Sequence, residues 1–145
     1  MSDLILEPFA TYVYFKFATN QSKEKWKKIL MQFIETLVSR CDDAGPSVIG
    51  HIKALALFPE KRYLRVSAVS SAHPPEVEGN PPDSFSEMKL TLNLLVYGLN
   101  KNLLQRITQE SISDQNLSID GNISLSPIGQ MDIKIITAWE MISGN

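Results

Sequence analysis

Cysteine and histidine are scarce in this chain, which has one cysteine, Cys41, and two histidines among 145 residues. A single cysteine cannot close a disulfide within the chain, so no disulfide framework supports the fold. The seven glycines are dispersed, and the sequence contains no glycine-rich phosphate-binding loop or dinucleotide fingerprint. These absences exclude a disulfide scaffold and argue against enzymes that depend on such loops, so we expect no cofactor.

Long apolar runs are also missing. The N-terminal residues lack the basic start and apolar stretch of a signal peptide, and no run approaches the length that spans a bilayer. Hydrophobic residues make up 43% and charged residues 21%, as in an ordinary globular protein. We therefore expect a single soluble domain over residues 1–145, located in the cytoplasm and without a membrane partner.

Charge is distributed unevenly along the chain. Residues 1–65 hold ten Lys or Arg against seven Asp or Glu, whereas residues 66–145 hold four against nine. Such an imbalance can mark a basic surface for an anionic partner, complementary patches of a self-associating protein, or charge that is simply scattered over the surface. The acidic second half would repel phosphate, so a nucleic-acid partner is not expected.

Alternation and helical spacing define the first half of the chain. Period-two alternation predicts a strand over residues 9–17, and apolar residues three and four apart predict a long helix from Trp26 to Cys41. Residues 20–22 offer its N-cap, and Gly45-Pro46 ends it.

Strands are predicted over 48–58 and 63–71, joined by a turn at 59–61. If Phe58 faces Tyr63, Ser70 lies opposite His51 and both faces of this hairpin are partly apolar, so another subunit could cover one of them.

A proline-rich acidic segment follows at residues 72–86. Pro74-Pro75 and Pro81-Pro82 disfavour helix and sheet, which predicts a flexible loop within the domain. The loop residues that could contact a ligand or partner are His73, Glu76, Glu78 and Asp83.

The second half repeats the order of the first. The patterns predict a strand over 88–97, a helix capped by Asn100 that runs to Ile112, and a hairpin with arms at 117–126 and 131–139. The fold class is therefore α+β, an antiparallel sheet with two helices on one face in the order βαββ-βαββ, which indicates an internal duplication. This order of strands and helices resembles that of the gyrase-inhibitor-like effector-binding domains and of ferredoxin-like sheets. That resemblance implies a small-ligand groove between the two halves.

Few residues could carry chemistry. The histidines are predicted on opposite faces of the sheet, and the spacing of Cys41, Asp42 and Asp43 matches no metal motif, so no metal site is expected. Cys41 lies on the apolar stripe of the first helix, where a buried and inert thiol is the ordinary interpretation. His51 opposite Ser70 could serve a small hydrolase, although no nucleophile elbow or placed carboxylate accompanies the pair.

Aromatic and basic residues share one predicted strand face. Single-stranded RNA could bind to this face, with its bases stacked on Tyr12 and Tyr14 and its phosphates neutralised by Lys16. Aromatic rings beside cations bind single strands in this way. Cross-strand packing or a dimer interface explains the same residues without RNA.

Our leading hypothesis is a non-enzymatic binding or accessory module for a small ligand or a protein partner. We expect it to form a homodimer or a higher homo-oligomer through its sheet surface. His51, Ser70, Trp26 and Trp139 are the expected ligand-binding residues. The alternatives are the RNA-binding face and the His51–Ser70 hydrolase.

Overall fold

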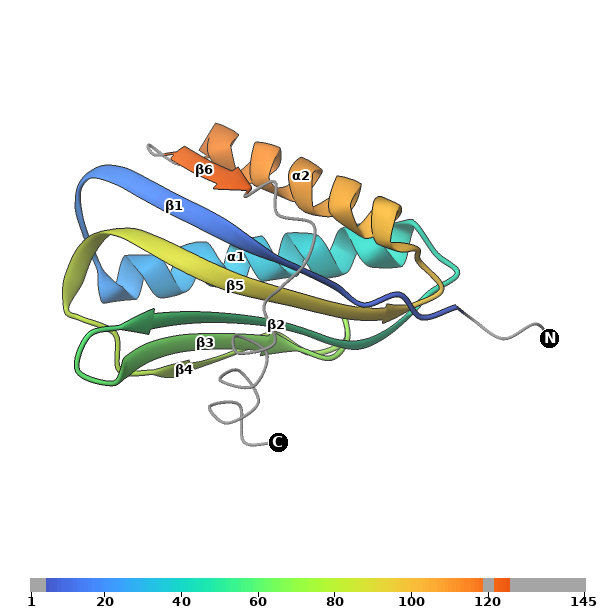
Figure 1. Ribbon diagram of the computed structural model, residues 1–145, viewed down its shortest axis with the longest axis horizontal. Coiled ribbons are helices and arrows are strands. Elements are labelled where there is room, and N and C mark those ends of the chain that lie inside the picture. The colour runs from blue at the N-terminus through green and yellow to red at the C-terminus, as the bar shows by residue number, and fades with distance from the viewer. Residues whose placement is uncertain (1–4, 119–121, 126–145) are drawn as a thin grey trace.

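The computed structural model describes residues 5–118 and 122–125, which form an α+β domain (Figure 1). The elements in chain order are β1 (Phe9–Ser22), α1 (Lys23–Asp43), β2 (Val48–Phe58), β3 (Arg62–Ala68), β4 (Glu76–Gly79), β5 (Ser84–Tyr97), α2 (Lys101–Ser118) and β6 (Asn122–Leu125). Strands β4, β3, β2, β5 and β1 lie side by side in an antiparallel sheet, and the short β6 pairs with the far side of β1. The predicted α+β class with an antiparallel sheet is confirmed.

The long helix α1 forms where the sequence predicted it. The Ser22 side chain accepts a hydrogen bond from the backbone N–H of Lys25 at 3.2 Å and so caps the first turn. The apolar stripe from Trp26 to Cys41 is buried, and α1 runs along the sheet in Figure 1. The predicted cap, stripe and end of this helix are therefore confirmed.

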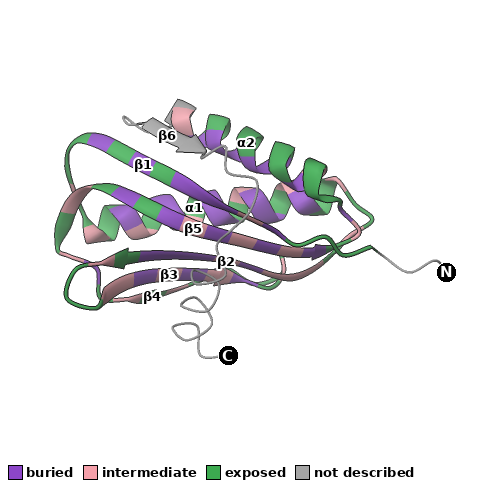
Figure 2. Cartoon of the chain, viewed as in Figure 1, coloured by how far each residue is buried: buried purple, intermediate pink, exposed green. Residues whose placement is uncertain are grey.

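One face of the sheet supplies the other half of the core. Alternate residues of the strands are buried with α1 and α2, including Phe15 of β1, Ile52 of β2, Val66 of β3 and Leu92 of β5 (Figure 2). We call the opposite side, which carries Tyr14, Leu57 and Lys89, the outer face of the sheet.

The helix α2 is capped by Asn100, as predicted, but it is longer than predicted. The Asn100 side-chain oxygen accepts a hydrogen bond from the backbone N–H of Leu103 at 2.8 Å.

On α1, Arg40 forms ion pairs with Glu110 and Asp114 of α2 and so ties the two helices together. The Asp114 hydrogen bond, followed by the nearby carboxylate charges, raises the pKa of Arg40.

The predicted duplication is wrong. A fourth strand, β4, forms between the two proline pairs and pairs with β3, so four strands in succession separate α1 from α2. Residues 117 and 118 of the predicted arm 117–126 continue α2, and residues 122–125 of it form β6. The second arm, 131–139, lies outside the described residues. The groove between two repeated halves is lost with the duplication.

The predicted register of the first hairpin is also wrong, by one residue. Phe58 pairs with Arg62 and Ile52 with Ala68, so the turn holds three residues. Its last two, Glu60 and Lys61, adopt positive φ angles of 64° and 60°, which let the chain reverse earlier than expected. With this register the apolar residues of β3 gather on the core face, because a one-residue shift moves every side chain to the opposite face. The outer face of the hairpin still carries Leu55 and Leu57 of β2, so the hairpin is partly apolar on both faces, although the β3 residues on each face differ from the prediction.

Neither helix in the described part of the chain combines the length and apolar composition needed to cross a bilayer.

Candidate functional site

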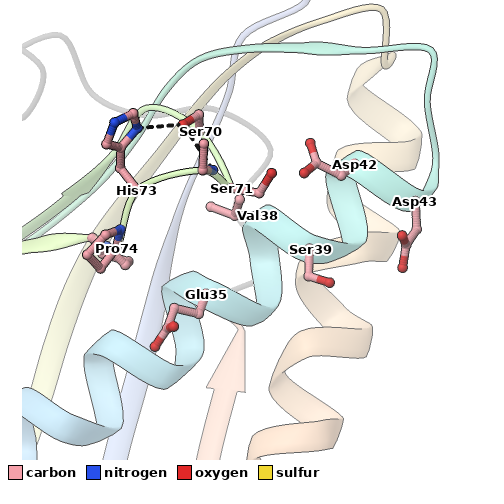
Figure 3. Close-up of a pocket in the computed structure, with 11 residues that line it drawn as sticks. Glu35, Val38, Ser39, Asp42, Asp43, Ser70, Ser71, His73 and Pro74 are labelled. Carbon is pink, nitrogen blue, oxygen red and sulfur yellow. Dashed lines mark hydrogen bonds between the residues drawn. The ribbon is translucent and has the colours of Figure 1, made fainter.

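A pocket of about 440 Å³ lies between the C-terminal half of α1 and the loop that follows β3 (Figure 3). The helix contributes three carboxylates, and the loop contributes hydroxyls, an imidazole and proline rings. The residues that line it are Glu35, Val38, Ser39, Asp42, Asp43, Ser70, Ser71, Ala72, His73, Pro74 and Pro75.

Hydrogen bonds shape the loop wall of this pocket. The Ser70 hydroxyl accepts from the backbone N–H of Ala72 and lies 3.2 Å from Nδ1 of His73, so it fixes both the turn and the imidazole (Figure 3). Pro75 is buried and begins the approach to β4. Prolines restrict the backbone, so this wall is held in place without a large cost in chain entropy at each binding event.

The helix wall of the pocket is strongly acidic. Glu35, Asp42 and Asp43 are exposed, and none of them makes an ion pair within the described part of the chain. Asp42 and Asp43 occupy the last turn of α1, where the partial negative charge of the helix dipole disfavours further anions. The nearby cation of α1, Arg40, is engaged by Glu110 and Asp114. The wall therefore presents three carboxylates without an ion pair in the described part of the chain, of which Asp43 lies near enough to Arg40 for its charge to raise the Arg40 pKa.

The polar groups of the site are hydroxyls, carboxylates and one imidazole. Ser70 and His73 form a hydroxyl–imidazole pair, but no carboxylate among the described residues hydrogen-bonds to His73 to orient it as a catalytic base. The described residues also include no group of three metal-ligating side chains. Hydroxyls, carboxylates and an imidazole around a small cavity suit a polar ligand with donor groups.

The structure does not bring His51 and Ser70 together. His51 pairs with Leu95 of β5 and does not line the pocket, and the corrected register removes Ser70 from the position opposite it. Burial, and then the charge of Lys53, lower the pKa of His51. The hydrolase hypothesis depended on this pair and is not retained.

The position of Trp26 does not support the prediction that this residue binds a ligand. Its side chain is fully buried beneath the sheet, its indole N–H donates to the backbone oxygen of Phe85 at 2.8 Å, and its ring stacks on Phe85 with centroids 4.8 Å apart. Trp26 is thus a core residue. Trp139 lies outside the described residues.

The predicted loop residues separate into three places. His73 lines the pocket, Glu76 and Glu78 belong to β4, and Asp83 lies beside the first turn of α1. Glu78 forms an ion pair with Arg65, and Asp83 with Lys23 at 3.3 Å. The segment 72–86 is therefore not a loop throughout, and its flexibility stays a prediction.

Sequence reasoning identified only part of this site. The sequence alone indicates Asp42 and Asp43 only as weak metal ligands, and it gives no reason to group Ser70 with His73. Glu35 and Ser39 were missed. Carboxylates concentrated toward the C-terminal end of a helix, against its dipole, were the available signal.

Comparison with known proteins found no matching family model, no matching curated protein and no matching solved structure.

Proposed function

We propose that this chain is a non-enzymatic binding module whose pocket between α1 and the β3–β4 loop takes a small ligand bearing a primary amine or a guanidinium group. The observation that carries the proposal is the set of three carboxylates, Glu35, Asp42 and Asp43, which lack ion pairs in the described part of the chain. A cationic group would offset the unfavourable interaction of Asp42 and Asp43 with the negative end of the helix dipole.

The rest of the pocket supports the same ligand class. Its volume of about 440 Å³ suits a small molecule. Ser39, Ser70 and Ser71 can exchange hydrogen bonds with the polar groups of such a ligand, while Val38 and Pro74 offer apolar contact to its carbon chain. A ligand of this kind would be held at its charged end by carboxylates and along its length by the loop.

The test is isothermal titration calorimetry at low ionic strength with arginine, agmatine and putrescine. We expect at least one of them to bind, and Asp42→Asn to weaken it by about tenfold, since a charge-assisted hydrogen bond contributes about 1.5 kcal/mol or more. Glu24→Gln is the matched control, because it removes the same charge from the exposed first turn of α1, outside the pocket. Equal losses in the two variants, or no binding of any of the three compounds, would contradict the proposal.

Self-association belongs to the same proposal and involves a different surface. Leu6 and Val48 both pair with Tyr97 at one end of the outer face, and all three side chains are exposed. At the β4 edge, the short strand lies between proline pairs, which disfavours strand addition there. Sedimentation velocity of the wild type and of Val48→Lys tests the idea. We expect a dimer or larger species that Val48→Lys converts to monomer, and a monomeric wild type at micromolar concentration would refute it.

A further inference from the structure

A second hollow, of about 320 Å³, lies over the N-terminal part of β5 and shares no residue with the acidic pocket. Its lining includes Tyr14 and Lys16 from β1, Leu57 from β2, and Glu87 and Lys89 from β5. In the sheet, β5 runs between β1 and β2, so this hollow is a groove with β5 as its floor. We call it the β5 groove.

The side walls of the β5 groove are apolar and accessible. Tyr14 is 38% exposed and Leu57 is 57% exposed, so both side chains are accessible to a ligand in the groove. Two strand spacings, about 10 Å in total, separate the backbones of β1 and β2. That separation leaves room for a flat ring, and an exposed tyrosine ring is a surface on which such a ring can stack.

The floor of the groove supplies positive charge at a fixed place. The Lys89 ammonium lies 4.0 Å from the ring centroid of Tyr12, and this cation–π contact restrains it. Lys16 adds a second cation, although Glu87 lies directly opposite it across the strand pair. The titratable side chains of the groove therefore carry a surplus of one positive charge beside an aromatic wall.

Tyr12 itself cannot act as a stacking platform. Its side chain is buried and its ring lies under Lys89. Of the three residues in the RNA hypothesis, Tyr14 and Lys16 remain available, and the structure adds Leu57 and Lys89 to them. An aromatic wall next to a restrained cation is the combination that recognises a planar ring joined to an anion.

We propose that the β5 groove binds a nucleotide, with the base against Tyr14 and Leu57 and the phosphate at Lys89, either as a free nucleotide or as one unit of a single strand. This inference rests on residues other than those of the acidic pocket, so each can fail without the other. It requires no chemical step.

The experiment titrates the full chain with AMP, with a ten-nucleotide single-stranded RNA and with inorganic tripolyphosphate, at two salt concentrations. AMP or the RNA should bind more tightly than tripolyphosphate, which lacks a base. Binding of both AMP and the RNA identifies the nucleotide unit as the ligand, and salt-sensitive binding of the RNA alone identifies the strand. Tighter binding of tripolyphosphate than of both others, or no binding of any probe, would overturn the proposal.

Variants separate stacking from general attraction. Tyr14→Ala should weaken binding by about tenfold, as loss of a base–aromatic stack does, while Tyr14→Phe should keep affinity within about twofold. Tyr63→Ala is the matched control, because Tyr63 is a partly exposed tyrosine of β3 that does not line the groove. Equal losses for Tyr14→Ala and Tyr63→Ala would overturn the assignment.

Charge variants test the position of the phosphate. Lys89→Gln should weaken binding and reduce its salt dependence, whereas Glu87→Gln should strengthen binding severalfold by removing a negative charge from the groove opposite Lys16. Binding that Glu87→Gln weakens and Lys89→Gln leaves unchanged would contradict a phosphate at this site.

Discussion

Replacing Trp26 by phenylalanine should destabilise the fold by about 3 kcal/mol. The exchange removes the hydrogen bond from the indole N–H to the backbone oxygen of Phe85, which contributes about 1 kcal/mol. It also removes one ring from a fully buried side chain that stacks on Phe85 and meets Phe15 and Phe17 edge-on. Because truncating a buried tryptophan to alanine costs about 3–5 kcal/mol, losing part of the ring system accounts for about 2 kcal/mol.

The assay is urea denaturation followed by far-ultraviolet circular dichroism, which does not depend on tryptophan emission. We expect a lower midpoint with an unchanged slope, as for a loss of stability without a change in the denatured state. Tyr97→Phe is the control, because its side chain is half-exposed and far less embedded. A loss below about 1 kcal/mol for Trp26→Phe would refute the claim that this residue anchors α1 to the start of β5.

Three further predictions concern single residues. Gly79→Ala should cost about 2 kcal/mol or more in urea titrations, because Gly79 has a φ of +126° and an added Cβ would lie 2.2 Å from the Tyr63 carbonyl oxygen; unchanged stability would contradict this. Since burial lowers the pKa of His51, the unfolded chain binds its proton more readily, so the free energy of unfolding should fall as pH decreases from about 7 to 5. His51→Gln should flatten that slope, and an unchanged slope would argue against the assignment. Burial, and then Asp42, raise the pKa of Cys41 to about 12, so the native thiol should react with an aromatic disulfide reagent at pH 8 only after urea is added; rapid reaction of the folded protein would show the thiol to be accessible.

Periodic patterns made most of the fold predictable. The buried stripe of α1 and the alternation of β5 are long enough that spacing alone located both elements. In contrast, the register of the first hairpin depends on positive φ angles at Glu60 and Lys61. Neither glutamate nor lysine is a residue type that indicates a positive φ. A shift of one residue in the pairing was enough to reverse the assignment of the β3 side chains to the two faces.

The missed strand and the missed half of the site have related causes. The prolines flank β4 and do not interrupt it. Because proline pairs are typical of loops, they led to the prediction of one continuous loop, and the strand between them was missed. The pocket joins α1 to residues more than 25 positions later, and only the tertiary fold brings Glu35 near His73. Local patterns identified Asp42 and Ser70 individually but could not place them on opposite walls of one cavity.

The most direct test of the acidic pocket as a ligand site is nuclear magnetic resonance of the ¹⁵N-labelled chain during titration with arginine. Saturable shifts should be confined to the amides of residues 35–43 and 70–75, and Asp42→Asn should reduce them. Shifts that do not saturate, or that concentrate at the first turn of α1, would contradict the proposal that these three carboxylates and the β3–β4 loop bind a cation.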